Sequence, residues 1–175
     1  MYRKSFILLI IFISSCTGGE ELETKTQFFD IKGFFEAEAN RLSNKKSYVD
    51  KSVIQNNQAE VKKKLAVDWD NELALFIASD INKPAWIDSY KVVGDGVRVT
   101  YLAIDTNLRT RFVEILKDKQ GKAVYFKIKN YTRSKLYESS EELSYFPDSI
   151  YKINKNQTVL FLGSNTYQII GKILK

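Results

Sequence analysis

The sequence predicts an α+β domain in which two helices from the N-terminal half pack on a large, curved antiparallel sheet. Three observations predict it. Helical spacing of apolar residues is confined to the part of the chain before Pro84. From Tyr90 onward the apolar residues follow a strand-like period. Links of three to five residues separate those segments, and links this short join antiparallel neighbours. A twisted sheet of this size can also curl into a half-barrel.

Residues 1–15 precede the domain and have the composition of a secretory signal peptide. Two basic residues stand before an unbroken apolar run, residues 6–13, and two serines follow that run. The run is much shorter than the roughly 20 apolar residues of a transmembrane helix. Cys16, the only cysteine of the chain, comes next. Residues 16–26 are polar and glycine-bearing, which predicts a flexible tether.

The first helix is predicted over residues 27–43. Its apolar residues recur at intervals of three and four, which places them on one face: Phe28, Ile31, Phe35, Ala39 and Leu42. Phe29 and Phe34 lie beside that face, so the helix is apolar over a wide arc. Deep burial explains this arc, and a helix partly facing lipid or another ligand is the alternative.

A hairpin and a second helix are predicted next. Strands at residues 48–55 and 58–65 flank Asn56–Asn57, a pair that tolerates the positive φ of a two-residue turn. The lysines at 62–64 indicate an exposed edge strand. Asp68 can cap the second helix. The buried stripe of that helix is Trp69, Leu73, Phe76 and Ile77, and Pro84 follows its end.

The remaining segments complete the sheet within a single domain, residues 27–175. The strands are predicted at residues 90–93, 97–104, 108–117, 122–130, 134–139, 149–153, 159–162 and 166–174. No internal repeat or low-complexity segment divides them.

Composition excludes several kinds of chemistry. The 175-residue chain has no histidine and a formal net charge of +6. A Ser-His-Asp or Cys-His site is therefore impossible, and a zinc site lacks both imidazole and a free thiolate. We expect no metal, no cofactor and no nucleic-acid partner. Glu138, Glu141 and Glu142 cluster beside an expected turn, where solvated charge is the ordinary interpretation. A small carboxylate-dependent hydrolase is the remaining enzymatic alternative.

Five residues are candidates for contact with a ligand or partner. Trp86 follows the end of the second helix, and Tyr125 and Tyr137 lie on or beside predicted strands. Tyrosine and tryptophan offer flat apolar faces with a polar tip, although cross-strand packing uses the same residues. Arg109 and Arg111 lie two apart on one strand. They are expected to share a face, where they can grip an anionic group or remain solvated.

Two patterns resemble known bacterial signals. Ile13-Ser14-Ser15-Cys16 resembles the lipobox of bacterial lipoproteins, which implies that Cys16 is acylated and becomes the mature N-terminus. Asp148-Ser149-Ile150 resembles the O-glycosylation motif of exported Bacteroidetes-type proteins, which implies a glycan on Ser149.

The folded part resembles a family of uncharacterised lipoproteins of Bacteroidetes-type bacteria. The resemblance spans most of residues 28–175 and is carried by residues 80–86, 108–111, 136–140 and 143–148. It implies membership of an envelope lipoprotein family and no catalytic residues.

The expected function is that of a membrane-anchored, non-catalytic lipoprotein that binds a protein partner or an envelope component. Its location is the cell envelope, at the outer membrane, on either side of it. One alternative is a carrier of lipid or another hydrophobic ligand, with an apolar cavity beneath the 27–43 helix. The other is the envelope hydrolase.

Overall fold

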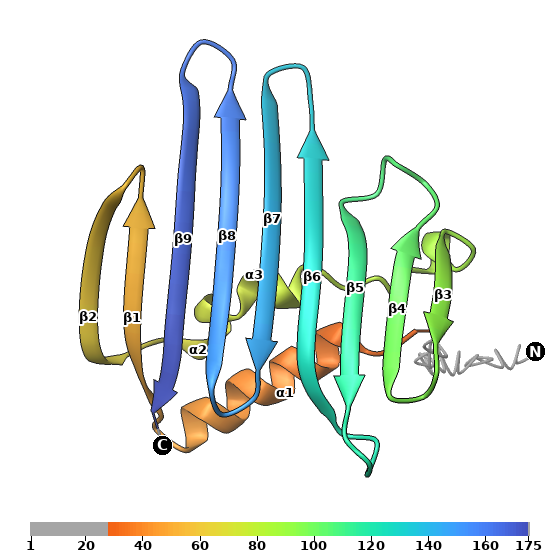
Figure 1. Ribbon diagram of the computed structural model, residues 1–175, viewed down its shortest axis with the longest axis horizontal. Helices are drawn as coiled ribbons and strands as arrows, with labels where there is room; N and C mark the ends of the chain where they lie inside the picture. Colours follow the sequence, from red (N-terminus) through yellow and green to blue (C-terminus); the bar gives the residue numbers. More distant parts are fainter. Residues whose placement is uncertain (1–27, 175) are drawn as a thin grey trace, which may run out of the picture.

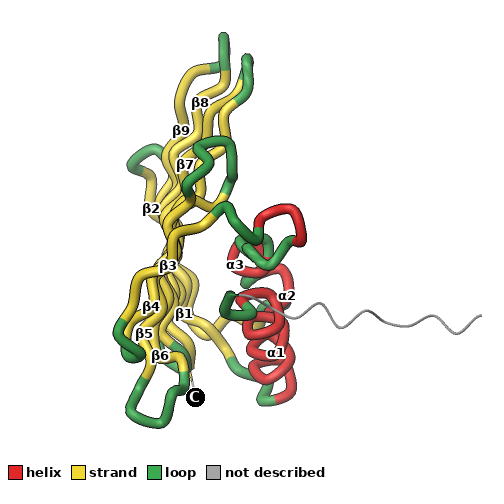
Figure 2. Tube along the Cα trace, turned by 90° about the vertical axis from the view of Figure 1, so that its right-hand side faces the viewer, coloured by secondary structure: helices red, strands yellow, loops and turns green. Residues whose placement is uncertain are grey.

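The computed structural model describes residues 28–174 and has two layers. One is a nine-stranded antiparallel sheet, and the other is a group of short helices on one of its faces (Figures 1 and 2). The strand order is β2-β1-β9-β8-β7-β6-β5-β4-β3. The predicted α+β class is confirmed. The half-barrel form is wrong, because the sheet stays open and uncurled. The helix layer, rather than closure of the sheet on itself, buries the apolar face.

The helices are α1 (Ile31–Asn44), α2 (Trp69–Glu72) and α3 (Ala74–Ile77), followed by a 3-10 turn, η1 (Pro84–Trp86). The strands are β1 (Tyr48–Gln55), β2 (Gln58–Ala66), β3 (Tyr90–Gly94), β4 (Arg98–Ala103), β5 (Thr110–Lys117), β6 (Ala123–Arg133), β7 (Tyr137–Phe146), β8 (Ile150–Val159) and β9 (Gly163–Leu174).

The first helix begins at a side-chain cap. Asp30 accepts a hydrogen bond of 2.8 Å from the backbone N–H of Gly33, which satisfies one of the free donors of the first turn. All five residues of the predicted stripe are buried. The arc that Phe29 and Phe34 widen also faces protein, since both rings pack against Phe126 of β6.

The second predicted helix is divided at Leu73 into α2 and α3, each of four residues. Asp68 caps α2 as expected, accepting from the backbone N–H of Asp70 at 3.0 Å. Trp69, Leu73 and Phe76 are fully or almost fully buried against the sheet. In the described range, no helix combines the length and the apolar composition needed to cross a membrane.

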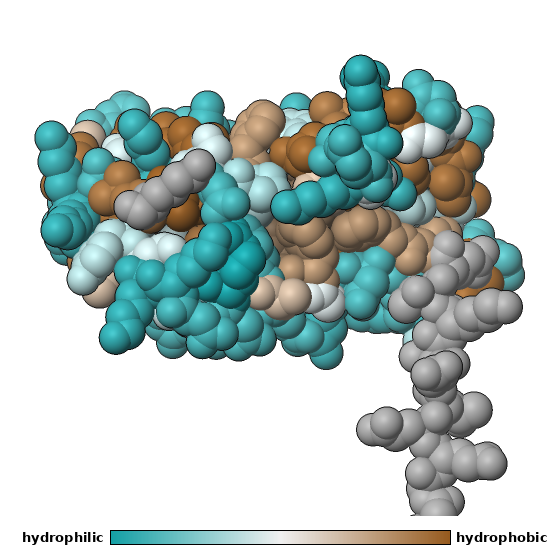
Figure 3. Space-filling model, turned by 90° about the horizontal axis from the view of Figure 1, so that it is seen from below, coloured by the Kyte–Doolittle hydropathy of each residue, from teal (hydrophilic) through white to brown (hydrophobic). Residues whose placement is uncertain are grey.

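Aromatic rings fill the space between the layers. The ring of Phe35 lies 4.8 Å from that of Phe76 and 5.1 Å from that of Tyr145, centroid to centroid. Phe34 lies 4.5 Å from Phe126. Aromatic contacts of this kind stabilise the fold beyond the contribution of burying apolar surface. Seen from below, hydrophilic residues cover much of the lower side of the view, where the helix layer lies, and hydrophobic residues show in the middle and along the sheet (Figure 3).

The predicted β1–β2 hairpin is confirmed. Asn56 and Asn57 both have positive φ, 47° and 70°, as a two-residue turn of this kind requires. β2 is an edge strand, and Lys62, Lys63 and Lys64 are exposed along it. Exposed lysines on an edge oppose pairing with another sheet.

The C-terminal strands differ from the prediction. Three long strands replace the four short ones expected over residues 134–174, so the polar segment 154–158 belongs to β8. Residues 160–162, expected within a strand because they are apolar, form the β8–β9 turn instead. β6 to β9 are the long strands of the sheet, and their upper ends extend past the helix layer (Figures 1 and 2).

Candidate functional site

A hollow of about 710 Å³ lies beside the end of β6 that extends past its pairing with β5. The β5–β6 ladder begins with the pair Thr110–Asn130, but β6 continues to Arg133. The β4–β5 link and the β6–β7 turn close the sides of the resulting notch. We call this the basic hollow; its lining residues are Thr106, Asn107, Arg109, Arg111, Tyr131, Thr132, Arg133, Ser134 and Lys135. Four of these side chains are basic and none is acidic.

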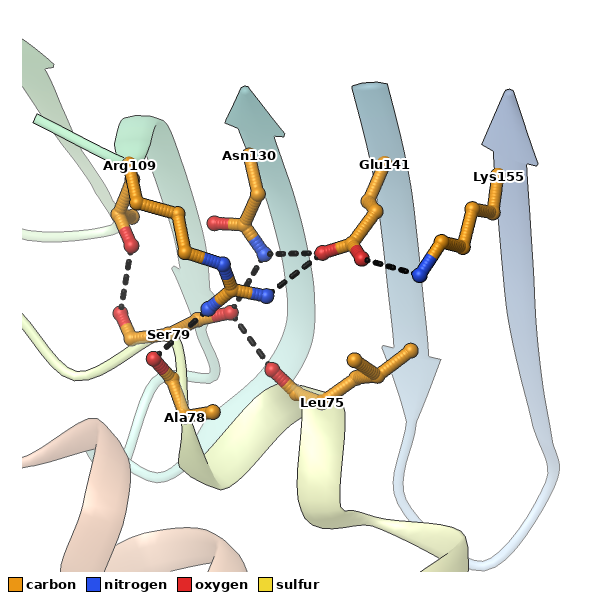
Figure 4. Close-up of polar contacts among 8 residues, drawn as sticks. Leu75, Ala78, Ser79, Arg109, Asn130, Glu141 and Lys155 are labelled. Carbon is orange, nitrogen blue, oxygen red and sulfur yellow. Dashed lines mark hydrogen bonds and ion pairs between the residues drawn. The ribbon is translucent and has the colours of Figure 1, made fainter. Parts of the chain in front are cut away.

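Arg109 is held at the boundary between this hollow and the helix layer (Figure 4). One guanidinium nitrogen donates to the backbone oxygen of Ala78 at 2.9 Å, and another donates to Oε2 of Glu141 at 2.6 Å. Glu141, on β7, is only 7% exposed. Its other oxygen lies 3.3 Å from the ammonium of Lys155 on β8. Arg109 is therefore oriented by two protein partners, Ala78 and Glu141.

Asn130 connects this ion cluster to the end of α3. Its side-chain amide donates to Oγ of Ser79 at 2.9 Å and to Glu141 at 3.2 Å. Ser79 in turn donates to the backbone oxygen of Leu75 at 2.7 Å. Within the described residues, Oδ1 of Asn130 and Oγ of Ser139 are buried without a hydrogen-bond partner. The hydrogen-bond network beside the hollow is therefore not fully satisfied. Each unpaired buried polar atom lowers the stability of the folded state.

Arg111 reaches the same hollow through a β-bulge. The register shifts between Thr110 and Phe112, which leaves Arg111 as the extra residue. Its guanidinium donates to the backbone oxygen of Asp105 at 3.3 Å and lies 5.5 Å from the ring centre of Tyr131. These partners are neutral, and no carboxylate among residues 28–174 forms an ion pair with Arg111.

The other two cations are close to solvent. Arg133 lies 4.0 Å from Glu138, and both side chains are more than half exposed, so this pair is weak. Lys135 makes no ion pair with any residue in the range 28–174. Three of the four cations of the hollow therefore keep most of their charge available to an anion.

Arg109 and Arg111 are the two candidate residues that the structure brings together. Arg109 directly precedes β5, Arg111 is the bulge residue within it, and both line the hollow. Arg133 and Lys135 were not among the predicted site residues, because the strand expected over residues 134–139 left no turn there to present them. Glu141 was not among them either, because its charge was expected to be solvated; it is instead buried. The available signal was the spacing of Glu141, Leu143 and Tyr145, since strand alternation places residues two and four apart on one face.

The other candidates lie apart from the hollow. Tyr125 is on the uncovered face of the sheet, with its ring 4.5 Å from that of Phe146, and burial raises its pKa. Tyr137 begins β7 opposite Val159. Trp86 packs against the core from η1, with the ammonium of Lys83 4.1 Å from its ring centre. Ser149 is exposed in the β7–β8 turn. Cys16 lies outside the described residues.

Two further carboxylates, the buried Glu38 and the partly buried Glu72, are tied to cations and tyrosines. Glu38 accepts from the hydroxyl of Tyr145 at 2.6 Å and forms a two-point ion pair with Arg41. Glu72 accepts from the hydroxyl of Tyr151 and pairs with Lys51 at 2.7 Å. Burial, followed by the adjacent carboxylate, raises the pKa of both tyrosines. Each cluster joins a helix to the sheet.

In residues 28–174 no group of three or more His, Cys, Asp or Glu side chains is arranged to hold a metal ion. The basic hollow combines Arg109, which is held by Ala78 and Glu141, with three further cations that have no buried carboxylate partner among the described residues. No family model, curated protein or solved structure matches the chain.

Proposed function

We propose that this protein is an exported lipoprotein, held at a membrane by acyl chains on Cys16, whose sheet domain binds a phosphate-bearing component of the cell envelope without catalysis. The signal-like N-terminus and the lipobox resemblance support the anchor. The composition of the basic hollow supports the ligand class. The proposed location is the envelope, at the outer membrane.

The observation that carries the ligand class is a concave surface with four cations and no carboxylate in its lining. A guanidinium offers paired donors that match the oxygens of phosphate. Thr106, Asn107 and Ser134 line the hollow beside these cations and add neutral polar groups to it. Arg109 is already paired with Glu141. The charge available to a ligand therefore comes mainly from the other three cations, Arg111, Arg133 and Lys135.

The carrier and hydrolase alternatives have less support. An acyl-chain cavity beneath residues 27–43 conflicts with the ring contacts that fill the α1–sheet interface. A carboxylate-dependent hydrolase needs acids free to exchange protons. Glu38, Glu72 and Glu141 are instead each held by a cation.

The test is a calorimetric titration of the acylated protein in neutral detergent micelles. Short-chain phosphatidylglycerol and inorganic phosphate are the ligands, and short-chain phosphatidylcholine controls for acyl contacts. We expect phosphatidylglycerol to bind with an affinity that falls as salt increases, since exposed charges are screened. Binding of inorganic phosphate alone would assign the hollow to a soluble phosphate.

A matched pair of variants separates the hollow from general surface charge. Arg111→Gln combined with Lys135→Gln removes two charges from the hollow, and we expect at least a tenfold loss of affinity. Lys91→Gln combined with Arg98→Gln removes two charges from the β3–β4 hairpin and should leave the affinity unchanged. Equal losses in both variants, or binding only to acidic peptides of a partner protein, would contradict the proposal.

A further inference from the structure

Four large apolar side chains are exposed together at the upper end of the sheet. Leu136 in the β6–β7 turn is 61% exposed, and in the β8–β9 turn Leu160 is 50%, Phe161 92% and Leu162 82% exposed. The backbone N–H of Leu160 donates to the oxygen of Leu136 at 2.9 Å, so the two turns form one surface. We call these four residues the apolar tip. The two turns stand at the end of the sheet farthest from α1 (Figure 1).

The backbone conformation of the β8–β9 turn does not favour the apolar residues that occupy it. The N–H of Leu162 donates to the oxygen of Val159 at 3.0 Å, which leaves Leu160 and Phe161 as the central turn residues. Phe161 has a φ of 69°, in the left-handed region. Glycine and asparagine normally occupy such positions, and this chain itself uses Asn56 and Asn57 in the β1–β2 turn. Phenylalanine is therefore unfavourable there in both conformation and exposure.

The charges around the apolar tip favour an anionic bilayer as its partner. Arg133 and Lys135 lie in or beside the same turn as Leu136 and line the basic hollow. The β8–β9 turn is flanked by uncharged residues, Thr158 and Ser164. An apolar projection with cations beside it suits a membrane whose headgroups carry phosphate, because the apolar side chains meet acyl chains while the cations meet the headgroups.

The proposed anchor lies within reach of such a contact. Residues 17–27 separate Cys16 from the described domain. A chain of that length spans at most about 36–40 Å when extended. This is comparable with the length of β8, whose ten residues extend over roughly 34 Å. The tether is thus long enough for the domain to turn its upper end toward the bilayer that holds the anchor.

We infer that the apolar tip inserts into the bilayer that carries the lipid anchor, so that the basic hollow faces the headgroups of that bilayer. This inference rests on the proposed function and extends it, because it assigns the phosphate to a membrane lipid and orients the domain. The protein then contacts one membrane at three places: the acyl chains of Cys16, the apolar tip and the basic hollow.

The experiment measures the depth of the tip in a membrane with the full acylated chain. Phe161→Trp is made in a Trp86→Phe background and reconstituted into vesicles of phosphatidylethanolamine and phosphatidylglycerol. Quenching of its fluorescence by lipids brominated on their acyl chains reports contact with the bilayer interior. Val61→Trp in the same background is the matched control, because Val61 is 62% exposed on the edge strand β2. Trp69 is buried in both proteins and contributes equally.

We expect quenching at position 161 to be several-fold stronger than at position 61, together with a blue-shifted emission. Equal quenching at the two positions overturns the inference. A blue shift at position 161 without quenching by the brominated lipids also overturns it, since the tip would then be covered by protein, such as a second copy of the chain.

A second pair of variants distinguishes failure of this inference from failure of the proposed function. Leu160→Ser combined with Phe161→Gly removes apolar surface and relieves the left-handed turn, so the protein should fold at least as well. Its affinity for short-chain phosphatidylglycerol in micelles should be unchanged, while protection of the β8–β9 turn from protease on vesicles should be lost. Unchanged protection would show that the tip stays outside the bilayer, whatever the hollow binds.

Discussion

The hydroxyl of Tyr145, on β7, donates a hydrogen bond of 2.6 Å to Oε1 of Glu38, on α1. Glu38 is 7% exposed and Tyr145 is fully buried, so a polar pair lies inside an otherwise aromatic interface. Arg41 completes it by donating to both oxygens of the same carboxylate. The helix therefore meets the sheet in one register, because sliding α1 would leave a charged group buried without partners.

Alkaline pH should destabilise the protein through its buried tyrosines. Unfolded tyrosines ionise near pH 10. The pKa of Tyr145 is raised by burial and then by Glu38, and burial raises the pKa of Tyr90 to about 12. The unfolded state then releases protons first, so this stability is present below about pH 10 and is lost as the pH rises. For Tyr90 the loss ends near pH 12.

Tyr145→Phe tests this assignment. Above pH 10 the free energy of unfolding should fall less steeply than in the unchanged protein, by up to about 1.4 kcal/mol per pH unit. At neutral pH the variant should lose about 1.5–3 kcal/mol, because a hydrogen bond to a charged group is removed. Urea unfolding between pH 8 and pH 11 measures both effects. Identical slopes in the two proteins would show that Tyr145 does not carry the pH dependence.

Two adjacent glutamates on β7 should respond very differently to neutralisation. Glu141→Gln leaves Arg109 and Lys155 without their shared carboxylate, and we expect a loss of about 2–4 kcal/mol, since both cations are partly exposed. Glu142→Gln affects only surface pairs with Lys127 and Lys129, and should change stability by less than about 1 kcal/mol. Equal thermal shifts in the two variants would contradict the burial assigned to Glu141.

Gly171 is required by a neighbouring ring. A Cβ at this position would lie 2.0 Å from the ring of Tyr151, which is fixed by its hydrogen bond to Glu72. Gly171→Ala should therefore destabilise the protein by about 1–3 kcal/mol or more through overpacking. Gly121→Ala is the control, since a Cβ there meets nothing within 4 Å and only its φ of 80° is strained, at about 1–2 kcal/mol. Chemical denaturation of both variants compares crowding with backbone strain.

The lipid anchor is tested in cells by Cys16→Ser. The unchanged chain should take up labelled palmitate and sediment with membranes, whereas the variant should do neither. A protein that stays in the membrane fraction after this change is held by something other than the acyl chains. Uptake of palmitate by the variant would move the modification away from Cys16.

Local patterns predicted the elements of this fold wherever one local rule decided the outcome. The spacing from Phe28 to Leu42 indicated α1, and Asn56–Asn57 indicated a hairpin that the structure confirms. The strand predicted at residues 159–162 was wrong, because an apolar run of four residues looks the same in a buried strand and in an exposed turn. Only the long-range pairing of β8 with β9 distinguishes the two.

The candidate site was predictable in part. Arg109 and Arg111 stood out by their spacing, but the bulge at Arg111 depends on the β5–β6 register. Arg133 and Lys135 become neighbours of Arg111 only because β6 continues past the start of β5. Contacts set by the sheet register carry no signal in the spacing of residues along the sequence.

The most direct test of the phosphate site is nuclear magnetic resonance of the arginine side chains in the acylated protein, titrated with short-chain phosphatidylglycerol in neutral micelles. The account predicts saturable shifts of the Nε–H signals of Arg109, Arg111 and Arg133, while Arg41 and Arg98 stay unmoved. Uniform small shifts at all five arginines, or shifts at Arg98 alone, would contradict a phosphate site in the basic hollow.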